Sequence, residues 1–130
     1  MVAVSTPKGQ GTPAIVLVED DDGLRGALVG MLTVCGFEVL PFSTAEGARD
    51  DAPWDRTACL LADIRLPGIS GFDLIEWLRR SGRQVPSIAM TAAPSQQARD
   101  VAKSLGVRAF FEKPIPGPVL VAAIRAAIVL

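Results

Sequence analysis

The sequence contains no histidine and only two cysteines, Cys35 and Cys59. These are too few soft ligands for a zinc or iron–sulfur site, so we expect neither. Both cysteines lie within apolar patterns, which favours buried free thiols over a disulfide and is typical of a reducing compartment. The cysteine usage therefore predicts a cytoplasmic location.

Neither sign of charge is in excess, because thirteen Lys and Arg residues face fourteen Asp and Glu residues. A nucleic-acid-binding surface needs a basic excess, and the sequence has no cluster of Lys and Arg to form one. No apolar run is long enough to cross a bilayer, and the N-terminus lacks the apolar stretch of a signal peptide. We expect no direct nucleic-acid binding and no membrane association.

The composition is that of one folded domain. The chain has 130 residues, of which 49% are hydrophobic and 21% charged. This length supports a single full core, and the hydrophobic content argues against disorder. Residues 1–12 are polar, contain Gly and Pro and show no periodicity, so we predict a flexible tail there and one domain over residues 13–130.

Five short apolar segments, each followed by a helical pattern, predict an α/β fold. The strand-like segments are residues 14–19, 37–42, 58–63, 86–91 and 107–112. The helical patterns are a stripe from Leu24 to Cys35 ended by Gly36, a short helix with Ser43 and Glu46 as a capping box, residues 71–80 with Ser70 as cap, a helix through Ala98 ended by Gly106, and a last helix from Leu120 to Ala127. This alternation predicts a doubly wound (βα)5 domain with a parallel sheet between two helical layers. Pro41 favours a sheet edge for the second strand.

Polar side chains follow four of the predicted strands at the point where each strand ends. They are Glu19, Asp20 and Asp21 at the end of the first, Asp63 at the end of the third, Thr91 at the end of the fourth, and Lys113 after the fifth. The small residue Ala92 follows Thr91 and leaves its backbone N–H unobstructed. Adjacent strand ends lie about 5 Å apart. Ligands of open α/β sheets bind beyond these carboxyl ends. We therefore expect the side chains to converge on one shallow cleft.

The residue types at these strand ends suit phosphoryl chemistry. Grouped carboxylates repel one another unless a cation intervenes, and hard oxygen ligands suit Mg2+. A lysine can balance a phosphoryl group, and a threonine hydroxyl can bond it. Asp63 stands apart from the acids after the first strand and is the best candidate nucleophile. Each residue alone has a simpler role, since acids often cap helices and Asp63 precedes a Pro67-Gly68 turn.

Four segments carry a resemblance to a known family. They are VLVEDD (16–21), LLADIRLPGISGFDL (60–74), IAMTA (88–92) and AFFEKP (109–114). Together they resemble the receiver domains of two-component response regulators over nearly the whole chain from Ala14. The resemblance implies a five-stranded parallel sheet in the flavodoxin-like order 2-1-3-4-5. It also implies a phospho-accepting switch rather than an enzyme.

The resemblance assigns roles to individual residues. Asp63 would accept the phosphoryl group, and Asp20 would coordinate Mg2+ directly, with Mn2+ as a substitute. Glu19 would assist through water, and Asp63 and the backbone carbonyl of Arg65 would complete the protein ligands. The remaining roles would fall to Thr91 and the Ala92 backbone N–H as phosphate donors, Lys113 as the charge partner, Phe110 as the aromatic switch residue, and a cis bond between Lys113 and Pro114.

The resemblance also implies partners. The donor would be a sensor histidine kinase, since the chain has no histidine of its own. Phosphorylation would repack the surface of the fourth helix, fifth strand and fifth helix, which is a possible homodimer face. The chain would act alone or as part of a longer regulator, and its apolar ending AAIVL favours the longer regulator. The motif DIRLPGISG resembles those of receivers attached to transcription factors, which favours a transcriptional output domain.

One alternative from another class is an Asp-nucleophile, Mg2+-dependent phosphatase of the haloacid dehalogenase type. Such an enzyme also places an aspartate, a threonine and a lysine at strand ends. It needs a second aspartate two residues after the nucleophile, where this chain has Arg65. The sequence therefore disfavours the enzyme.

Overall fold

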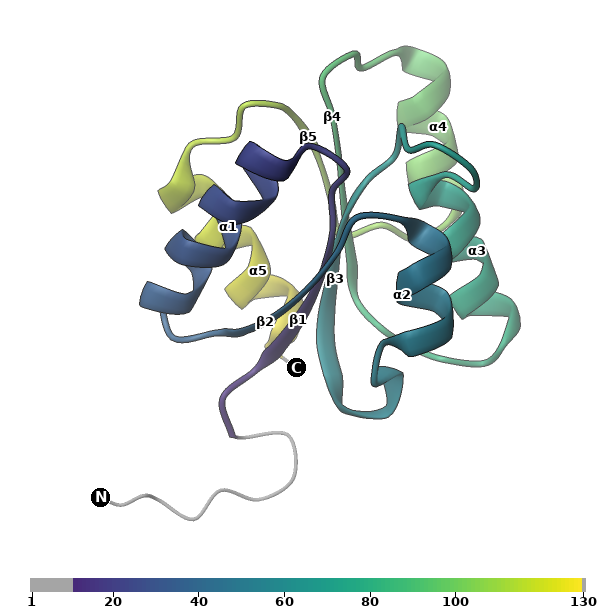
Figure 1. Cartoon of the computed structure of the whole chain (residues 1–130). Coiled ribbons are helices and arrows are strands. Elements are labelled where there is room, and N and C mark those ends of the chain that lie inside the picture. The colour runs from purple at the N-terminus through teal and green to yellow at the C-terminus, as the bar shows by residue number, and fades with distance from the viewer. Residues whose placement is uncertain (1–10, 130) are drawn as a thin grey trace.

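Residues 11–129 are described by a computed structural model (Figure 1). Five parallel strands form one sheet in the order β2-β1-β3-β4-β5, as predicted. The strands are β1 (Ala14–Val18), β2 (Glu38–Phe42), β3 (Thr57–Asp63), β4 (Ser87–Thr91) and β5 (Ala109–Glu112). The helices are α1 (Asp22–Val34), α2 (Ala45–Asp51), α3 (Gly71–Arg80), α4 (Gln96–Ser104) and α5 (Gly117–Ile128), with a short 3-10 helix η1 (Trp54–Arg56). The predicted doubly wound α/β fold is confirmed.

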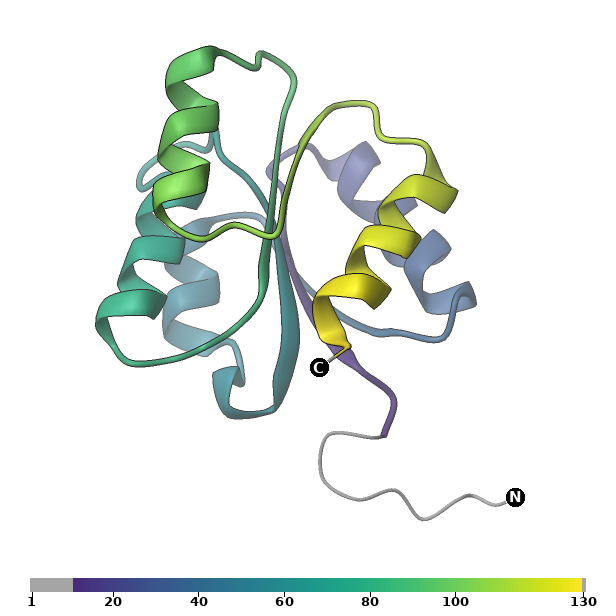
Figure 2. The ribbon, with the colours of Figure 1, turned by 180° about the vertical axis from the view of Figure 1, so that it is seen from behind.

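Helices cover both faces of the sheet, with α1 and α5 on one side and α2, α3 and α4 on the other (Figures 1 and 2). Side chains alternate along each strand, so each face has its own core. Ile15 and Leu61 belong to the α1/α5 core, whereas Val16 and Leu60 belong to the core beneath α2 and α3. All four are fully buried, which explains why the central strands are continuously apolar.

The helix ends follow from local sequence, with one prediction wrong. Asp21 caps α1 through the backbone N–H of Leu24, and Gly36 follows the helix with a φ of +97°, a conformation that favours glycine. Ser70 caps α3 in a capping box with Asp73. The predicted capping box of Ser43 and Glu46 is wrong, since Thr44 caps α2.

Other expectations lie at the margins of the fold. Pro41 lies in β2, which is an edge strand. Cys35 and Cys59 are free thiols, and Cys59 is buried. The predicted flexible tail falls almost wholly on residues 1–10, which lie outside the described residues. Within residues 11–129, every helix is too short or too polar to cross a membrane.

Candidate functional site

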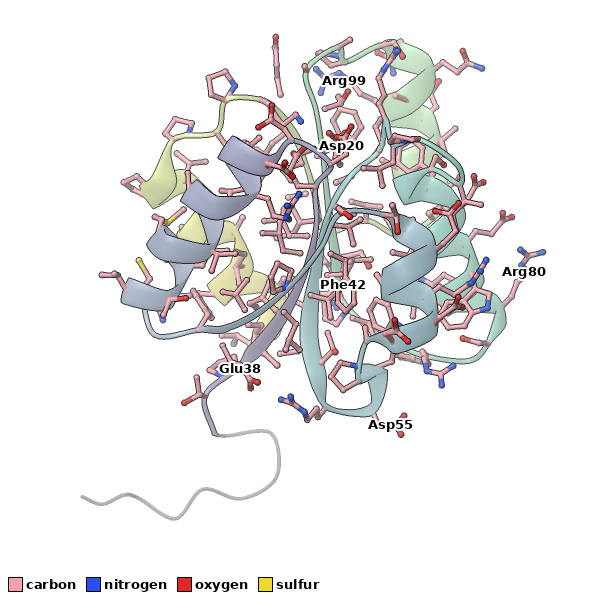
Figure 3. All side chains as sticks on the ribbon, in the orientation of Figure 1. Asp20, Glu38, Phe42, Asp55, Arg80 and Arg99 are labelled. Carbon is pink, nitrogen blue, oxygen red and sulfur yellow. The ribbon has the colours of Figure 1, made fainter. Side chains whose placement is uncertain are left out.

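The predicted polar residues gather at the carboxyl edge of the sheet, the end where Figure 3 labels Asp20. Glu19 and Asp20 directly follow β1, and Asp63 is the last residue of β3, the neighbouring strand. Thr91 ends β4, and Lys113 directly follows β5. The parallel strand order therefore brings residues up to 94 positions apart to one edge.

Three carboxylates form a cluster at this edge. Glu19, Asp20 and Asp63 each offer an oxygen, and these oxygens lie within 4.8 Å of one another. Glu19 is fully buried and Asp63 is 4% exposed, whereas Asp20 faces solvent. Glu19 and Asp63 are thus shielded from solvent, whereas the carboxylate of Asp20 is accessible to water.

Lys113 bridges the two buried carboxylates. Its Nζ donates to Asp63 Oδ2 at 2.6 Å and to Glu19 Oε1 at 2.9 Å. Burial opposes the charge of Lys113, but these hydrogen bonds outweigh it and raise the pKa of the ammonium group. Burial raises the pKa of Glu19, against the hydrogen bonds from Asp21 and Lys113. The bridge to Glu19 is a contact that the sequence analysis did not predict.

Backbone groups fix the acids in place. Asp63 Oδ1 accepts from the backbone N–H of Arg65 at 2.9 Å, and Glu19 Oε2 accepts from that of Asp21 at 3.0 Å. Arg25 donates from its guanidinium to the backbone carbonyl of Glu19 at 2.9 Å. Each buried carboxylate therefore has both oxygens bonded, so neither side chain is free to rotate away.

The loop after Asp63 packs without spare room. A Cβ added at Gly71 would lie 2.3 Å from the backbone oxygen of Asp63. Across the loop, Glu46 Oε2 accepts from the backbone N–H of Ile69 at 3.2 Å. Glu46 thus ties α2 to the loop beside the acidic cluster. Local sequence gives no sign of this role, because 23 positions separate the two residues.

Two further predicted site residues, Thr91 and Phe110, lie in β4 and β5. Thr91 is fully buried, and its hydroxyl accepts from the backbone N–H of Ala93 at 3.2 Å, while Ala92 is exposed. Phe110 is half-buried and stacks against Phe72, with ring centroids 6.5 Å apart. The Arg99 guanidinium lies 5.3 Å from the Phe110 ring, and the Lys113–Pro114 bond is cis.

The donor set fits a hard divalent cation. Carboxylate oxygens are the ligands that Mg2+ and Ca2+ prefer, and an exposed carboxylate leaves room for bound water. Lys113 offsets only part of the negative charge of the three carboxylates, so the cluster keeps a net negative charge. Glu19, Asp20 and Asp63 can hold a metal ion together.

The fold and the site together define a class: a small open α/β domain with an acidic cluster and a lysine at the carboxyl edge of its sheet. The chain belongs to the response regulator receiver domain family, whose family model matches residues 15–125. Receiver domains are phospho-acceptor switches rather than catalytic enzymes, so the phosphatase alternative is set aside. Membership also implies a cognate histidine kinase.

Similar proteins support this assignment. The transcriptional regulatory protein FixJ of Azorhizobium caulinodans is 34% identical over 86% of this chain and 53% of its own length. The non-phosphorylated HemR receiver domain of Leptospira biflexa is 29% identical, with a TM-score of 0.84 over 92% of this chain and 96% of that chain. The BeF3-activated receiver domain of RstA from Klebsiella pneumoniae is 26% identical, with a TM-score of 0.82 over 90% and 99%. The chain spans about half the length of the curated relatives it matches.

Proposed function

We propose that Asp63 accepts a phosphoryl group from a phosphohistidine of a sensor histidine kinase. The P–N bond to the imidazole breaks, and a P–O bond forms to a carboxylate oxygen of Asp63. The observation that carries this assignment is the position of Asp63, which is 4% exposed, 2.6 Å from the Lys113 ammonium group and within one cluster with Glu19 and Asp20. Positioning and charge supply most of the catalysis of such a transfer.

The acidic cluster would bind Mg2+, for which Mn2+ would substitute. Asp20 and Asp63 would bind it directly, with Glu19 assisting and the backbone carbonyl of Arg65 as a further ligand. When bound, Mg2+ supplies positive charge to the oxygens of the transferring group. Asp20 is the exposed member of the cluster, so it is the entry point for a hydrated ion.

The switch in this proposal starts from Thr91. Phosphorylation adds about 1.5 to 2 negative charges beside it. The Thr91 hydroxyl would exchange its bond with the Ala93 N–H for one to the phosphoryl group, joined by the Ala92 N–H, while Lys113 pairs with the phosphate. Phe110 would then leave its stack with Phe72 and move inward, which changes the surface of α4, β5 and α5.

The domain would act in the cytoplasm, where its kinase partner presents the phosphohistidine. Its curated relatives are transcriptional regulators about twice its length, which supports a transcriptional output domain. The α4-β5-α5 surface exposes Val101 by 37% and Val119 by 47%, and we expect it to form a homodimer on activation. Sizing the protein with and without beryllofluoride tests this, and a monomer in both states contradicts it.

The phosphorylation site is tested with Mg2+ and acetyl phosphate, a small donor that replaces the kinase. Intact mass should show one added phosphoryl group in the wild type and none in Asp63→Asn. Asp55→Asn is the matched control, because Asp55 is an exposed acid at the opposite end of the molecule (Figure 3). A phosphorylated Asp63→Asn variant contradicts the assignment.

A further inference from the structure

A pocket lined in part by arginines lies at the amino edge of the sheet, opposite the acidic cluster. It has a volume of about 280 Å3 and lies where the segment after α3 meets the turn after α4. Figure 2 shows these two connections leading into β4 and β5. Three arginines are among the residues that line this pocket: Arg79, Arg83 and Arg108.

Neutral groups are the partners of two of these arginines. Arg79 donates to the backbone carbonyls of Leu105 and Val85, at 3.2 and 3.1 Å. Arg83 lies over the ring of Trp77 at 5.4 Å, and its buried Nε has no hydrogen-bond partner among residues 11–129. A buried donor without an acceptor is costly, so a ligand that offers an acceptor to Arg83 Nε would bind favourably.

Within the part of the chain that the structure describes, none of the three arginines forms an ion pair. The ion pairs within residues 11–129 involve Arg25, Arg49, Arg56, Arg80 and Lys113. Arg56, at the same edge of the sheet, is held by both carboxylate oxygens of Glu38. Burial lowers the pKa of Arg79, and repulsion from the neighbouring Arg108 lowers it further.

Two glycines line the pocket. Gly82 and Gly106 follow the ends of α3 and α4 with φ values of +81° and +71°, a conformation that ends helices. A Cβ added at either would meet no atom within 4 Å. The space beside the arginines is therefore accessible to a molecule from solvent.

We propose that this pocket binds a phosphoryl oxyanion, either inorganic phosphate or the phosphate group of a small molecule. Guanidinium groups match such anions with forked, charge-assisted hydrogen bonds. Three guanidinium groups around one cavity suit a tetrahedral anion, which offers oxygens in several directions, better than a planar carboxylate. The proposal is independent of phosphorylation at Asp63.

The test is a titration with inorganic phosphate, followed by 1H–15N NMR at constant ionic strength. EDTA excludes metal ions, so that the acidic cluster does not recruit phosphate. We expect saturable shifts of the Gly82 and Gly106 amides, with the Asp63 amide unmoved. Sodium acetate should give no saturable shift, and acetate binding equal to phosphate overturns the phosphoryl assignment. Tighter binding of β-glycerophosphate supports a small phosphorylated molecule, and equal binding supports the free ion.

Two variants and a control make the test specific. Arg108→Gln and Arg83→Gln should each weaken phosphate binding about tenfold, the loss of one charged hydrogen bond. Arg80→Gln removes the same charge from an exposed side chain that points away from the molecule (Figure 3), and it should bind like the wild type. Equal affinity in all four proteins, or a linear response without saturation, means an adventitious ion only and overturns the proposal.

Discussion

At the carboxyl edge of the sheet, three carboxylates lie beside the single ammonium group of Lys113, whereas three guanidinium groups at the amino edge have no carboxylate partner among residues 11–129. Lys113 offsets part of the negative charge at the first edge, whereas no carboxylate among residues 11–129 offsets the positive charge at the second. The near-zero net charge of the chain therefore conceals two local imbalances of opposite sign. A cation suits one edge and an anion suits the other.

The largest effect should come from removing the counter-ion at the carboxyl edge. Lys113→Gln leaves Glu19 and Asp63 buried without their shared cation, and removing one partner of a buried pair costs about 3–5 kcal/mol. We expect that loss in the free energy of unfolding at pH 7, measured with denaturant. The loss should shrink when Mg2+ is added, because the ion replaces part of the missing charge. A variant as stable as the wild type would show that the edge is not internally paired.

A somewhat smaller effect should follow from crowding the loop beside Asp63. Gly71→Ala places a Cβ 2.3 Å from the Asp63 backbone oxygen, and such overpacking costs about 1–3 kcal/mol. Phosphorylation by acetyl phosphate should slow as Asp63 shifts. Gly30→Ala in α1 is the matched control, because a Cβ there meets nothing within 4 Å and should stabilise by about 1 kcal/mol. Equal stability of the two variants contradicts the packing argument.

Alkaline pH should destabilise the protein through Cys59. Burial raises the pKa of its thiol from 9.0 to about 12. A raised folded-state pKa gives stability that is present below pH 9 and is lost as the pH rises toward 12. The expected slope is about 1.4 kcal/mol per pH unit. Lys113, with a pKa raised above 10.5, adds its own loss only at higher pH.

The measurement is denaturant unfolding at several pH values between 9 and 10.5. The chain has no tyrosine, which removes a common source of alkaline titration. Cys59→Ala should flatten the slope in this range. If the slope persists unchanged in that variant, the buried thiol is not its cause.

The smallest effect should come from the amino edge, and it sharpens the comparison. Arg108→Gln removes a cation that is exposed and paired with no carboxylate among the described residues, and it relieves the repulsion of Arg79. We expect the free energy of unfolding to change by no more than about 0.5 kcal/mol. Any stabilisation should be larger at low salt, where the repulsion between the arginines is less screened. Denaturant unfolding at two salt concentrations measures it. A loss comparable to that of Lys113→Gln would erase the difference between the two edges.

The sequence predicted the architecture because strand and helix periodicities alternate with little interruption. It also predicted the members of the carboxyl-edge cluster, since parallel strands end at one edge and the residues there are contiguous with strands. It did not predict contacts made across the fold. Glu46 has the spacing of a helix cap, yet it bonds Ile69 in a distant loop. No sequence pattern marks that contact.

The arginine pocket was missed for the same reason. Arg79 and Arg83 lie close together in the sequence, at the end of α3 and just beyond it, but Arg108 comes only after α4. The packing of the two helix ends brings these residues together. The sequence gives no sign that Arg108 joins the other two, because that proximity depends on tertiary structure.

The central claim is that Asp63 carries the phosphoryl group, and locating that group tests it most directly. The protein is treated with Mg2+ and acetyl phosphate, and borohydride then reduces the acyl phosphate to an alcohol, which converts the modified aspartate to homoserine. Peptide mass spectrometry should find homoserine at position 63 and at no other acidic position. Homoserine at Asp20 or elsewhere, with Asp63 intact in a folded protein, would contradict the account.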